Sequence, residues 1–416
     1  MKKPQISKNA RLITAMCTVV YFASYIMRIN FAAMLVRIGA DLNVPKTELA
    51  IIVTALTVTY GAGQIISGIL GDKLPANHMI TAGLSMACAC NIAMFFCESI
   101  PIMAVIWGVN GAAHSMLWPP IVKIMSSSLK DFEYSRCTVC IYHGSSVATI
   151  AIYLICPWIM GTLGWRSVHL ICAGVGAAVM VAWIVLNPRF VYSSNNFPST
   201  APKTGKIKQF EPIPKFVFFP LVLIMLGITA QGMLRDGVTN WMPSFMLETF
   251  GLSEENAIVS TVVLSVFSIL SFSLFNFIHS RFFRNEVTCA NVIFGASAIS
   301  AALLLVSNLM FSKAALSMIL MGAIVSCMHG INLMLITIVP KRFVRSGKVS
   351  TVSGVLNSCT YVGSSVATYA FAAIAENFGW NATVLAWVIV SVAGFAVCAV
   401  ASPFWKKFRK IYADKP

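Results

Sequence analysis

Residues 144–149 read GSSVAT, and residues 363–368 read GSSVAT again, 219 positions further along the chain. A Gly-Trp pair follows each copy, at 164–165 and at 379–380, 215 positions apart. Landmarks that recur with nearly one period indicate an internal repeat, in which the second half of the chain follows the plan of the first.

The regions around both copies are strongly apolar. Of the 416 residues, 58% are hydrophobic and 11% are charged, and the mean hydropathy is +0.80. A soluble surface needs more charge than this, so lipid must cover most of the chain. A spanning helix needs about 20 mostly apolar residues. The apolar runs predict twelve such helices, near 12–36, 47–71, 78–97, 102–126, 136–163, 166–186, 215–247, 255–280, 287–309, 312–339, 348–375 and 380–404.

The length of these runs excludes membrane strands, which would show turn signals about every ten residues. We therefore predict an all-α integral membrane protein whose 12 transmembrane helices form two six-helix pseudo-symmetric bundles. The polar segment 187–214 contains several Pro, Asn and Lys residues and predicts a cytoplasmic linker. It would join an N-terminal bundle at 1–186 to a C-terminal bundle at 215–416.

The net charge of +16 is unevenly placed around the predicted helices. With both termini in the cytoplasm, only Arg37, Lys46, Arg166 and Lys313 fall in outer segments. This asymmetry follows the positive-inside rule and argues against nucleic acid as the partner. The first apolar run lacks a small-residue cleavage site, so we expect it to be retained as a helix. We expect a multi-pass protein of the inner or plasma membrane with both termini cytoplasmic.

The chain shows no pattern typical of a cofactor site or an enzyme. Its cysteines are scattered through apolar runs, and the CxxC of Cys137 and Cys140 lacks a second pair and a histidine at ligand spacing. Buried packing is the expected role of these thiols. We predict no metal, no other cofactor and no catalytic activity, because no nucleophile–base pair emerges.

Two arginines, Arg28 and Arg235, fall inside the first predicted helix of each half. An arginine at the centre of a membrane helix costs about 2.5–3.5 kcal/mol on insertion scales. Such a residue is expected to face a wet cavity, and its planar fork of donors suits a carboxylate or phosphate. The alternative is a structural arginine paired with a carboxylate, but Asp236 is the only acid at this depth. The pair predicts a two-sided clamp for a small anion.

Other polar side chains fall on the same helix faces as these arginines. Tyr21 and Tyr25 precede Arg28 at helical spacing, and Gln231 precedes Arg235. Hydrogen bonding between helices explains each one equally well taken alone, but their distribution predicts a cavity lining. The predicted substrate-binding residues are Arg28, Arg235, Tyr21, Tyr25, Tyr60, Gln64, His143, Tyr361, His329 and Asn357. The predicted lining helices also carry Asn110, His114, Asn332 and Ser364.

Asp236 has two interpretations, which the sequence leaves open. It either neutralises a nearby cation or carries a coupling proton, as membrane carboxylates often do. Adjacent helical residues point about 100° apart, so a direct pair with Arg235 does not follow from the sequence.

Several blocks resemble the organophosphate:phosphate antiporters, a branch of the major facilitator superfamily that includes bacterial glycerol-3-phosphate and hexose-6-phosphate transporters. The resemblance covers nearly the whole chain. Its blocks are Tyr21-x-x-x-Tyr25-x-x-Arg28-x-Asn30-Phe31, Trp118-Pro119-Pro120, His143-x-x-Ser146, Leu234-Arg235-x-Gly237-x-x-x-Trp241-x-Pro243 and Tyr361-Val362-Gly363 before Gly379-Trp380.

The resemblance implies that Arg28 and Arg235 clamp a phosphoryl group, surrounded by Tyr21, Tyr25, Tyr60 and His143. It implies alternating access and exchange of an organophosphate for inorganic phosphate. Asp72 and Lys73 fall where the superfamily has a G-x-x-x-D-[RK] loop, and look like gating contacts.

The chain also departs from this branch. Gln64 replaces a lysine and Asp236 a tyrosine, while Ile29 and Asn240 replace a basic and an acidic residue. With one cation fewer, the site would prefer a monoanion or couple to protons.

The sequence therefore predicts a secondary active transporter, working as a monomer in the bilayer. Its partners would be a small anionic solute, expected to be phosphorylated, and inorganic phosphate or a proton as the coupling species. Two alternatives stay open: a proton-coupled symporter of sugar acids or other carboxylates, and a transporter-like membrane sensor of sugar phosphates.

Overall fold

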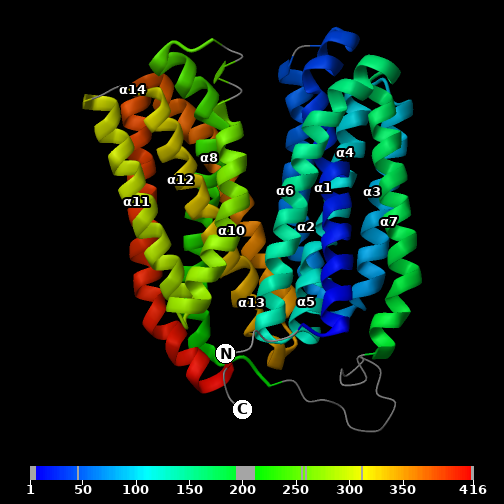
Figure 1. Ribbon diagram of the computed structural model, residues 1–416, viewed down its shortest axis with the longest axis vertical. Helices are drawn as coiled ribbons and strands as arrows, with labels where there is room; N and C mark the ends of the chain where they lie inside the picture. Colours follow the sequence, from blue (N-terminus) through cyan, green and yellow to red (C-terminus); the bar gives the residue numbers. More distant parts are fainter. Residues whose placement is uncertain are drawn as a thin grey trace. The chain divides into compact units, whose positions relative to one another are not determined.

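The computed structural model describes residues 6–44, 46–193, 211–253, 256–257, 260–310 and 313–413. Within these ranges the regular structure is entirely helical. The chain divides into two compact units, the first comprising Met1–Glu211 with Ser346–Val355 and the second Pro212–Arg345 with Leu356–Pro416. The long helices of each unit run side by side (Figure 1).

The first unit contains seven helices within the described part of residues 1–211. They are α1 (Lys8–Leu42), α2 (Lys46–Lys73), α3 (Ala76–Phe96), α4 (Ile100–Ser115), α5 (Trp118–Ser128), α6 (Asp131–Leu163) and α7 (Trp165–Ser193). The second unit contains η1 (Lys215–Val217), α8 (Phe218–Phe250), α10 (Val262–Phe282), α11 (Glu286–Met310), α12 (Ala314–Ile331), η2 (Asn332–Ile338), α13 (Val339–Lys341), η3 (Val344–Ser346), α14 (Val349–Phe408) and η4 (Arg409–Ala413), with the start of α14 assigned to the first unit. Residues 194–210 of the predicted linker lie outside the described residues.

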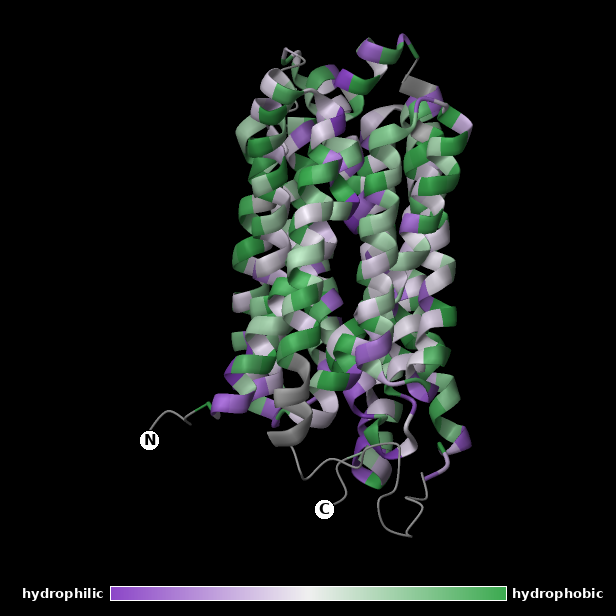
Figure 2. Ribbon diagram, turned by 90° about the vertical axis from the view of Figure 1, so that its right-hand side faces the viewer, coloured by the Kyte–Doolittle hydropathy of each residue, from purple (hydrophilic) through white to green (hydrophobic). Residues whose placement is uncertain are grey.

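The predicted membrane fold is confirmed. Eleven helices in the described ranges are long and apolar enough to cross a bilayer. Hydrophobic residues predominate along the long middle stretches of these helices (Figure 2). Large apolar side chains such as Leu154 and Trp158 are 73% and 71% exposed, as expected for side chains in contact with lipid.

The structure has eleven apolar spans in the described ranges where the sequence predicts twelve, because the last two predicted helices are joined at Gly379. The last span, Val349–Ala413, consists of two helices that meet at a kink, and these are the helices predicted at 348–375 and 380–404. Gly379 lies between them with φ 79° and ψ 174°, a conformation that is essentially restricted to glycine. Gly164 has φ 79° and ψ 160° and separates α6 from α7 at the matching place in the first half. Both Gly-Trp pairs therefore mark the same turn between two spans.

The GSSVAT segments also have the same packing role in the two halves. A Cβ on Gly144 would come within 2.7 Å of the Thr18 side chain, so α6 lies directly against α1 there. A Cβ on Gly363 would come within 2.0 Å of the Thr229 carbonyl, so α14 lies directly against α8. In each unit the repeated glycine allows the helix that carries it to approach the arginine-bearing helix.

The helix predicted over 102–126 is divided into α4 and α5. The chain turns at Met116 and Leu117, and Pro119 and Pro120 occupy the first positions of α5. Proline has no backbone N–H and clashes with the preceding turn, so it begins a helix more readily than it continues one.

Candidate functional site

Arg28 lies on α1, half-buried, between two aromatic rings. Its guanidinium carbon is 4.5 Å from the centre of the Tyr25 ring and 4.8 Å from the centre of the Tyr60 ring, which comes from α2. Ring faces attract a cation without neutralising it, each by about 0.5–2 kcal/mol. The two rings therefore stabilise a charged guanidinium at a depth where lipid alone would not.

The aromatic surroundings of Arg28 extend beyond the predicted residues. The Tyr21 ring lies 5.1 Å from the Tyr25 ring and 5.1 Å from the Trp118 ring, and Trp118 lies 5.6 Å from Tyr142 on α6. Trp118 and Tyr142 were not among the predicted site residues. The predicted residues Tyr21 and Tyr25 of α1 and Tyr60 of α2 are thus gathered around Arg28. Trp118, at the start of α5, extends this aromatic cluster.

Gln64 lies one turn after Tyr60 on α2 and is fully buried. Neither atom of its side-chain amide has a hydrogen-bond partner among the described residues. An unsatisfied buried polar group costs about 1–3 kcal/mol, so such an amide is suited to a polar ligand atom. The predicted binding role of Gln64 stays a prediction, and its burial beside the Arg28 cluster supports it.

His114 on α4 belongs to the same region, although it was not among the predicted substrate-binding residues. Its Nδ1 atom is 3.0 Å from the Ser24 hydroxyl on α1, and its Nε2 atom is buried without a partner in the described chain. The ring is close enough to Arg28 to interact with its charge. One signal was present in the sequence, because His114 and His329 are 215 positions apart, the same offset as the Gly-Trp pairs.

The backbone beside Arg28 is held by side-chain amides. Asn91 on α3 and Asn110 on α4 each donate a hydrogen bond of 3.1 Å to the carbonyl oxygen of Met27. Asn30 donates in turn to the Asn91 amide oxygen at 2.8 Å. These bonds fix the α1 backbone at the residue before Arg28, and so fix where its side chain starts.

In the second unit, Arg235 on α8 forms a two-pronged ion pair with its neighbour Asp236. Arg235 Nε donates to Asp236 Oδ1 at 2.6 Å, and Nη2 donates to Oδ2 at 2.8 Å. Ser364 on α14 donates its hydroxyl to the same carboxylate. His329 on α12 is close enough to interact with both charges. Although adjacent residues leave the helix in different directions, the long arginine side chain turns back to its neighbour.

The remaining predicted residues of this unit, Asn357 and Tyr361, lie on α14, the helix that carries Ser364. Asn357 and Tyr361 share a face of α14 with Ser364, at spacings of four and three residues. Gln231, one turn before Arg235, is instead tied into helix packing, since its amide donates to Met328 O at 3.2 Å and accepts from Thr360.

His143, a predicted site residue of the first unit, is half-buried on α6 and follows Tyr142 of the aromatic cluster. Its binding role stays a prediction.

Asp72, predicted as a gating residue, caps the first turn of α14. Its carboxylate accepts hydrogen bonds from the backbone N–H groups of Ser350 and Thr351 at 2.8 and 2.9 Å, and from the Thr351 hydroxyl. Lys73, predicted alongside it, is exposed. Lys123 of α5 is a second cation at this end of α2, and its ammonium donates to backbone carbonyls of residues 71, 72 and 74 at 2.5–3.3 Å. The gating role of Lys73 stays a prediction.

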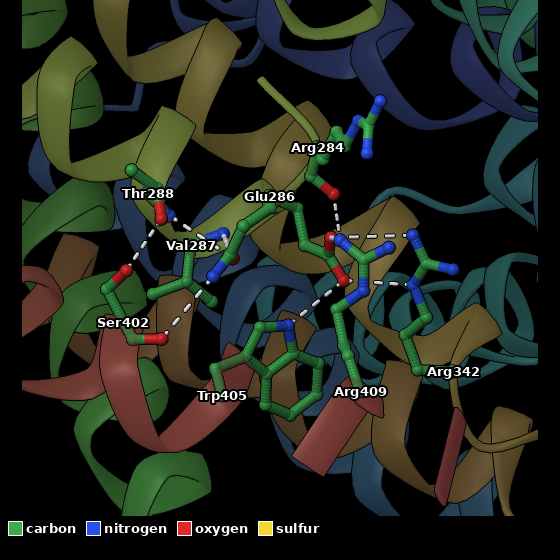
Figure 3. Close-up of polar contacts among 9 residues, drawn as sticks. Arg284, Glu286, Val287, Thr288, Arg342, Ser402, Trp405 and Arg409 are labelled. Atoms are coloured by element: carbon green, nitrogen blue, oxygen red, sulfur yellow. Dashed lines mark hydrogen bonds and ion pairs between the residues drawn. The ribbon is translucent and has the colours of Figure 1, made fainter. Parts of the chain in front are cut away.

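A second buried charge cluster surrounds Glu286 at the start of α11 (Figure 3). Its carboxylate is 0% exposed and accepts from Arg342 Nε, Arg409 Nη1 and Trp405 Nε1, each at 3.0 Å. Figure 3 shows the two guanidinium groups converging on this one carboxylate. The donors come from two segments, the residue after α13 and the continuous end of α14 with η4, so the cluster joins both to the start of α11 and has a structural role.

The described residues include no group of three or more His, Cys, Asp and Glu side chains that could hold a metal ion. The cysteines, Cys137 and Cys140 included, carry free thiols.

The family model described as Major Facilitator Superfamily matches residues 17–368. The glycerol-3-phosphate transporter of Bacillus subtilis is 23% identical over 397 residues, covering 87% of this chain and 85% of its own length. The membrane sensor protein UhpC of Escherichia coli is 19% identical over 404 residues, covering 92% and 89%. The crystal structure of the transporter FucP in the outward conformation has a TM-score of 0.70 at 13% identity, covering 96% of this chain and 99% of that one, and shows the fold.

Proposed function

This chain belongs to the Major Facilitator Superfamily, and from that premise we propose that it is a secondary active transporter of a small organic anion. The anion is a phosphorylated metabolite, exchanged for inorganic phosphate by alternating access. The resemblance to the organophosphate:phosphate branch is confirmed by relatives that include a glycerol-3-phosphate transporter. The observation that carries the proposal is the placement of Arg28 between the rings of Tyr25 and Tyr60.

The aromatic support of Arg28 favours an anionic ligand for a physical reason. Aromatic rings attract a guanidinium without bringing a charge of the opposite sign, whereas a carboxylate brings a negative charge that offsets the positive one. Its planar donors match the oxygen geometry of a phosphoryl or carboxylate group. In this proposal the anion binds Arg28 and Arg235, with Tyr21, Tyr25, Tyr60, Gln64, His143, His329, Asn357 and Tyr361 around it.

The gate of the transport cycle is proposed to include Asp72. Its carboxylate holds the first turn of α14 through two backbone N–H groups, where the helix dipole also favours a negative charge. Release of Ser350 and Thr351 from this carboxylate would free that turn to move when the site changes its access. Both termini are proposed to be cytoplasmic, the protein to lie in the cell membrane, and the working form to be a monomer.

Counterflow into proteoliposomes tests the proposed exchange. Liposomes preloaded with inorganic phosphate are mixed with a labelled sugar phosphate, glycerol phosphate or sugar acid outside. Uptake of a phosphorylated solute that requires internal phosphate supports the proposal. Uptake of a sugar acid alone, independent of internal phosphate, contradicts it.

Two alternatives have specific support. The likeness to a membrane sensor protein favours a sensor, and saturable binding of a sugar phosphate without flux would establish it. The carboxylate of Asp236 at depth favours proton-coupled uptake of carboxylates. Uptake that requires a proton gradient and is lost in Asp236→Asn would establish that second alternative.

A further inference from the structure

The end of α14 and the η4 segment that follows it have one buried face and one exposed face. The aromatic rings of the buried face contact one another in a row, with centres 4.9 and 5.4 Å apart, and belong to Trp405, Phe408 and Tyr412. The lysines of the same stretch are exposed: Lys406, Lys407 and Lys410. Because residues three and four apart share a helix face, this pattern directs the lysines away from the core of the second unit.

The turn from α10 to α11 packs against this stretch and adds two more exposed cations, Arg281 and Arg284. Arg409 Nη1 donates to the Arg284 carbonyl oxygen, and Asn285 Nδ2 donates to Ser402 O at 3.3 Å. The Arg284 side chain is directed away from the Glu286 carboxylate (Figure 3). These exposed cations together form the basic surface: Arg281, Arg284, Lys406, Lys407 and Lys410.

Exposed aromatic rings lie beside the basic surface. Lys407 Nζ is 5.8 Å from the centre of the Phe216 ring, and the Phe219 and Phe404 rings are 5.1 Å apart. All three phenylalanines are exposed. The cations therefore lie where the apolar spans of α8 and α14 reach their polar ends, a boundary at which aromatic and basic side chains face lipid headgroups.

The carboxylates of the second unit do not neutralise this surface. Glu286 lies next to it, but its side chain is 0% exposed and already accepts from two other arginines. The remaining described carboxylates of this unit lie elsewhere along α8 and α14: Asp236, Glu248 and Glu376. Glu211 and Lys215, just before α8, carry opposite charges and offset each other. None of the cations of the basic surface forms an ion pair within the described chain.

We propose that the basic surface binds the headgroups of anionic phospholipids at this end of the second unit. The ammonium and guanidinium groups contact the lipid phosphate, and the exposed phenylalanines contact the acyl chains below it. A zwitterionic phospholipid binds more weakly, because its own cation faces the basic surface. The lipid site is separate from the transported solute, so it goes beyond the proposed function and does not depend on it.

Lipid binding to the purified full-length protein in a non-ionic detergent tests the proposal. Native mass spectrometry gives apparent dissociation constants for phosphatidylglycerol, which is anionic, and for phosphatidylcholine with the same acyl chains, which is zwitterionic. Each basic side chain beside an anionic headgroup contributes about fivefold in affinity, so two of them contribute roughly 30-fold. The wild-type protein should therefore prefer phosphatidylglycerol by roughly 30-fold.

The variants locate the lipid on the protein. Lys406→Gln/Lys407→Gln should bind phosphatidylglycerol roughly 30-fold more weakly and phosphatidylcholine as wild type does. Lys406→Arg/Lys407→Arg keeps both charges and should retain the preference. Lys8→Gln/Arg11→Gln is the matched control, because it removes two exposed cations from α1 of the first unit and should also retain the preference.

Three results would overturn the proposal. Equal affinities of the wild-type protein for the two lipids would show that the surface does not select anionic headgroups. Equal losses in Lys406→Gln/Lys407→Gln and in the control would assign the attraction to the net charge of the protein. Displacement of phosphatidylglycerol by an equal concentration of inorganic phosphate would indicate a site for a soluble anion.

A readout on the unaltered protein keeps the test decisive should Lys406→Gln/Lys407→Gln not fold. The Debye length falls from about 10 Å at about 0.1 M salt to about 3 Å at about 1 M. The preference of wild type for phosphatidylglycerol should largely disappear over this range in a volatile salt. A preference that stays constant would contradict an electrostatic site and overturn the proposal.

Discussion

Replacing Glu286 by glutamine should destabilise the second unit strongly, because the change leaves two buried cations without their counter-charge. Glutamine has nearly the same shape and retains one acceptor oxygen. It loses the negative charge that faces Arg342 and Arg409, whose side chains are 17% and 15% exposed. In glutamine an NH₂ group also replaces one carboxylate oxygen. This donor would point at a guanidinium or at the Trp405 N–H, and both of these are donors themselves.

The expected loss follows from this geometry. Breaking a buried ion pair by removing one partner costs about 3–5 kcal/mol. For a unit of about 200 residues each kcal/mol lowers Tm by about 2–4 °C, so the predicted shift is at least about 6 °C. Thermal unfolding of the purified protein in detergent measures it, with free energies from chemical denaturation as the second reading.

Glu98 provides a matched control for this substitution. It pairs with Arg166 at 3.5 Å, but its side chain is 83% exposed. Exposed pairs contribute about 0–1 kcal/mol, so Glu98→Gln should shift Tm by no more than about 4 °C. If both variants shift Tm by the same small amount, the cluster of Glu286 is not the stabilising element described here.

Three further predictions concern the proposed gate at Asp72, the repeated glycine and the aromatic rings beside Arg28. Asp72→Asn should weaken the cap on α14 by about 1 kcal/mol, and hydrogen exchange at residues 350–351 should be about fivefold faster; unchanged exchange would contradict the capping role. Gly363→Ala should lower the free energy of unfolding by about 1–3 kcal/mol or more, because the added Cβ would clash with the Thr229 carbonyl. Gly174→Ala is the control and should not destabilise the protein, because a Cβ there has no atom within 4 Å. Equal stabilities of the two variants would refute the close approach of the helices. Tyr60→Leu should weaken phosphate binding about 3-fold to 30-fold while Tyr60→Phe retains it, as isothermal calorimetry can show; equal losses would assign the effect to the hydroxyl.

Much of the fold could be predicted from the length of the apolar runs and from the internal repeat of GSSVAT and Gly-Trp. These signals are local, because a helix of about 20 apolar residues is required wherever the chain crosses a bilayer. The Gly-Trp pairs were recognised as landmarks, and the structure adds their cause in the shared backbone conformation of Gly164 and Gly379. The break between α4 and α5 was missed, although Pro119 and Pro120 indicated it.

The candidate site could be predicted only in part. Helical spacing placed Tyr21, Tyr25 and Arg28 on one face, and the structure brings them together with Tyr60 from another helix. Spacing does not give side-chain conformations, so the ion pair of Arg235 with its own neighbour could not be deduced.

Contacts between side chains of different helices could not be predicted from the sequence either. The Trp118 ring packs against the Tyr21 ring at a tilt, and the Lys123 ammonium donates to the backbone at the end of α2. Both depend on how α5 lies against its neighbours, which no pattern in a single helix records.

The central claim is that Arg28 and Arg235 together bind an anion, and equilibrium binding of labelled inorganic phosphate tests it most directly. Arg28→Ala and Arg235→Ala should each weaken binding by about 10-fold to 150-fold, the loss expected for a charge-assisted hydrogen bond worth about 1.5–3 kcal/mol. Arg37→Ala serves as the control, since Arg37 lies on the same helix as Arg28 with its side chain 58% exposed, and should bind as wild type. Wild-type affinity in both Arg28→Ala and Arg235→Ala would contradict the claim.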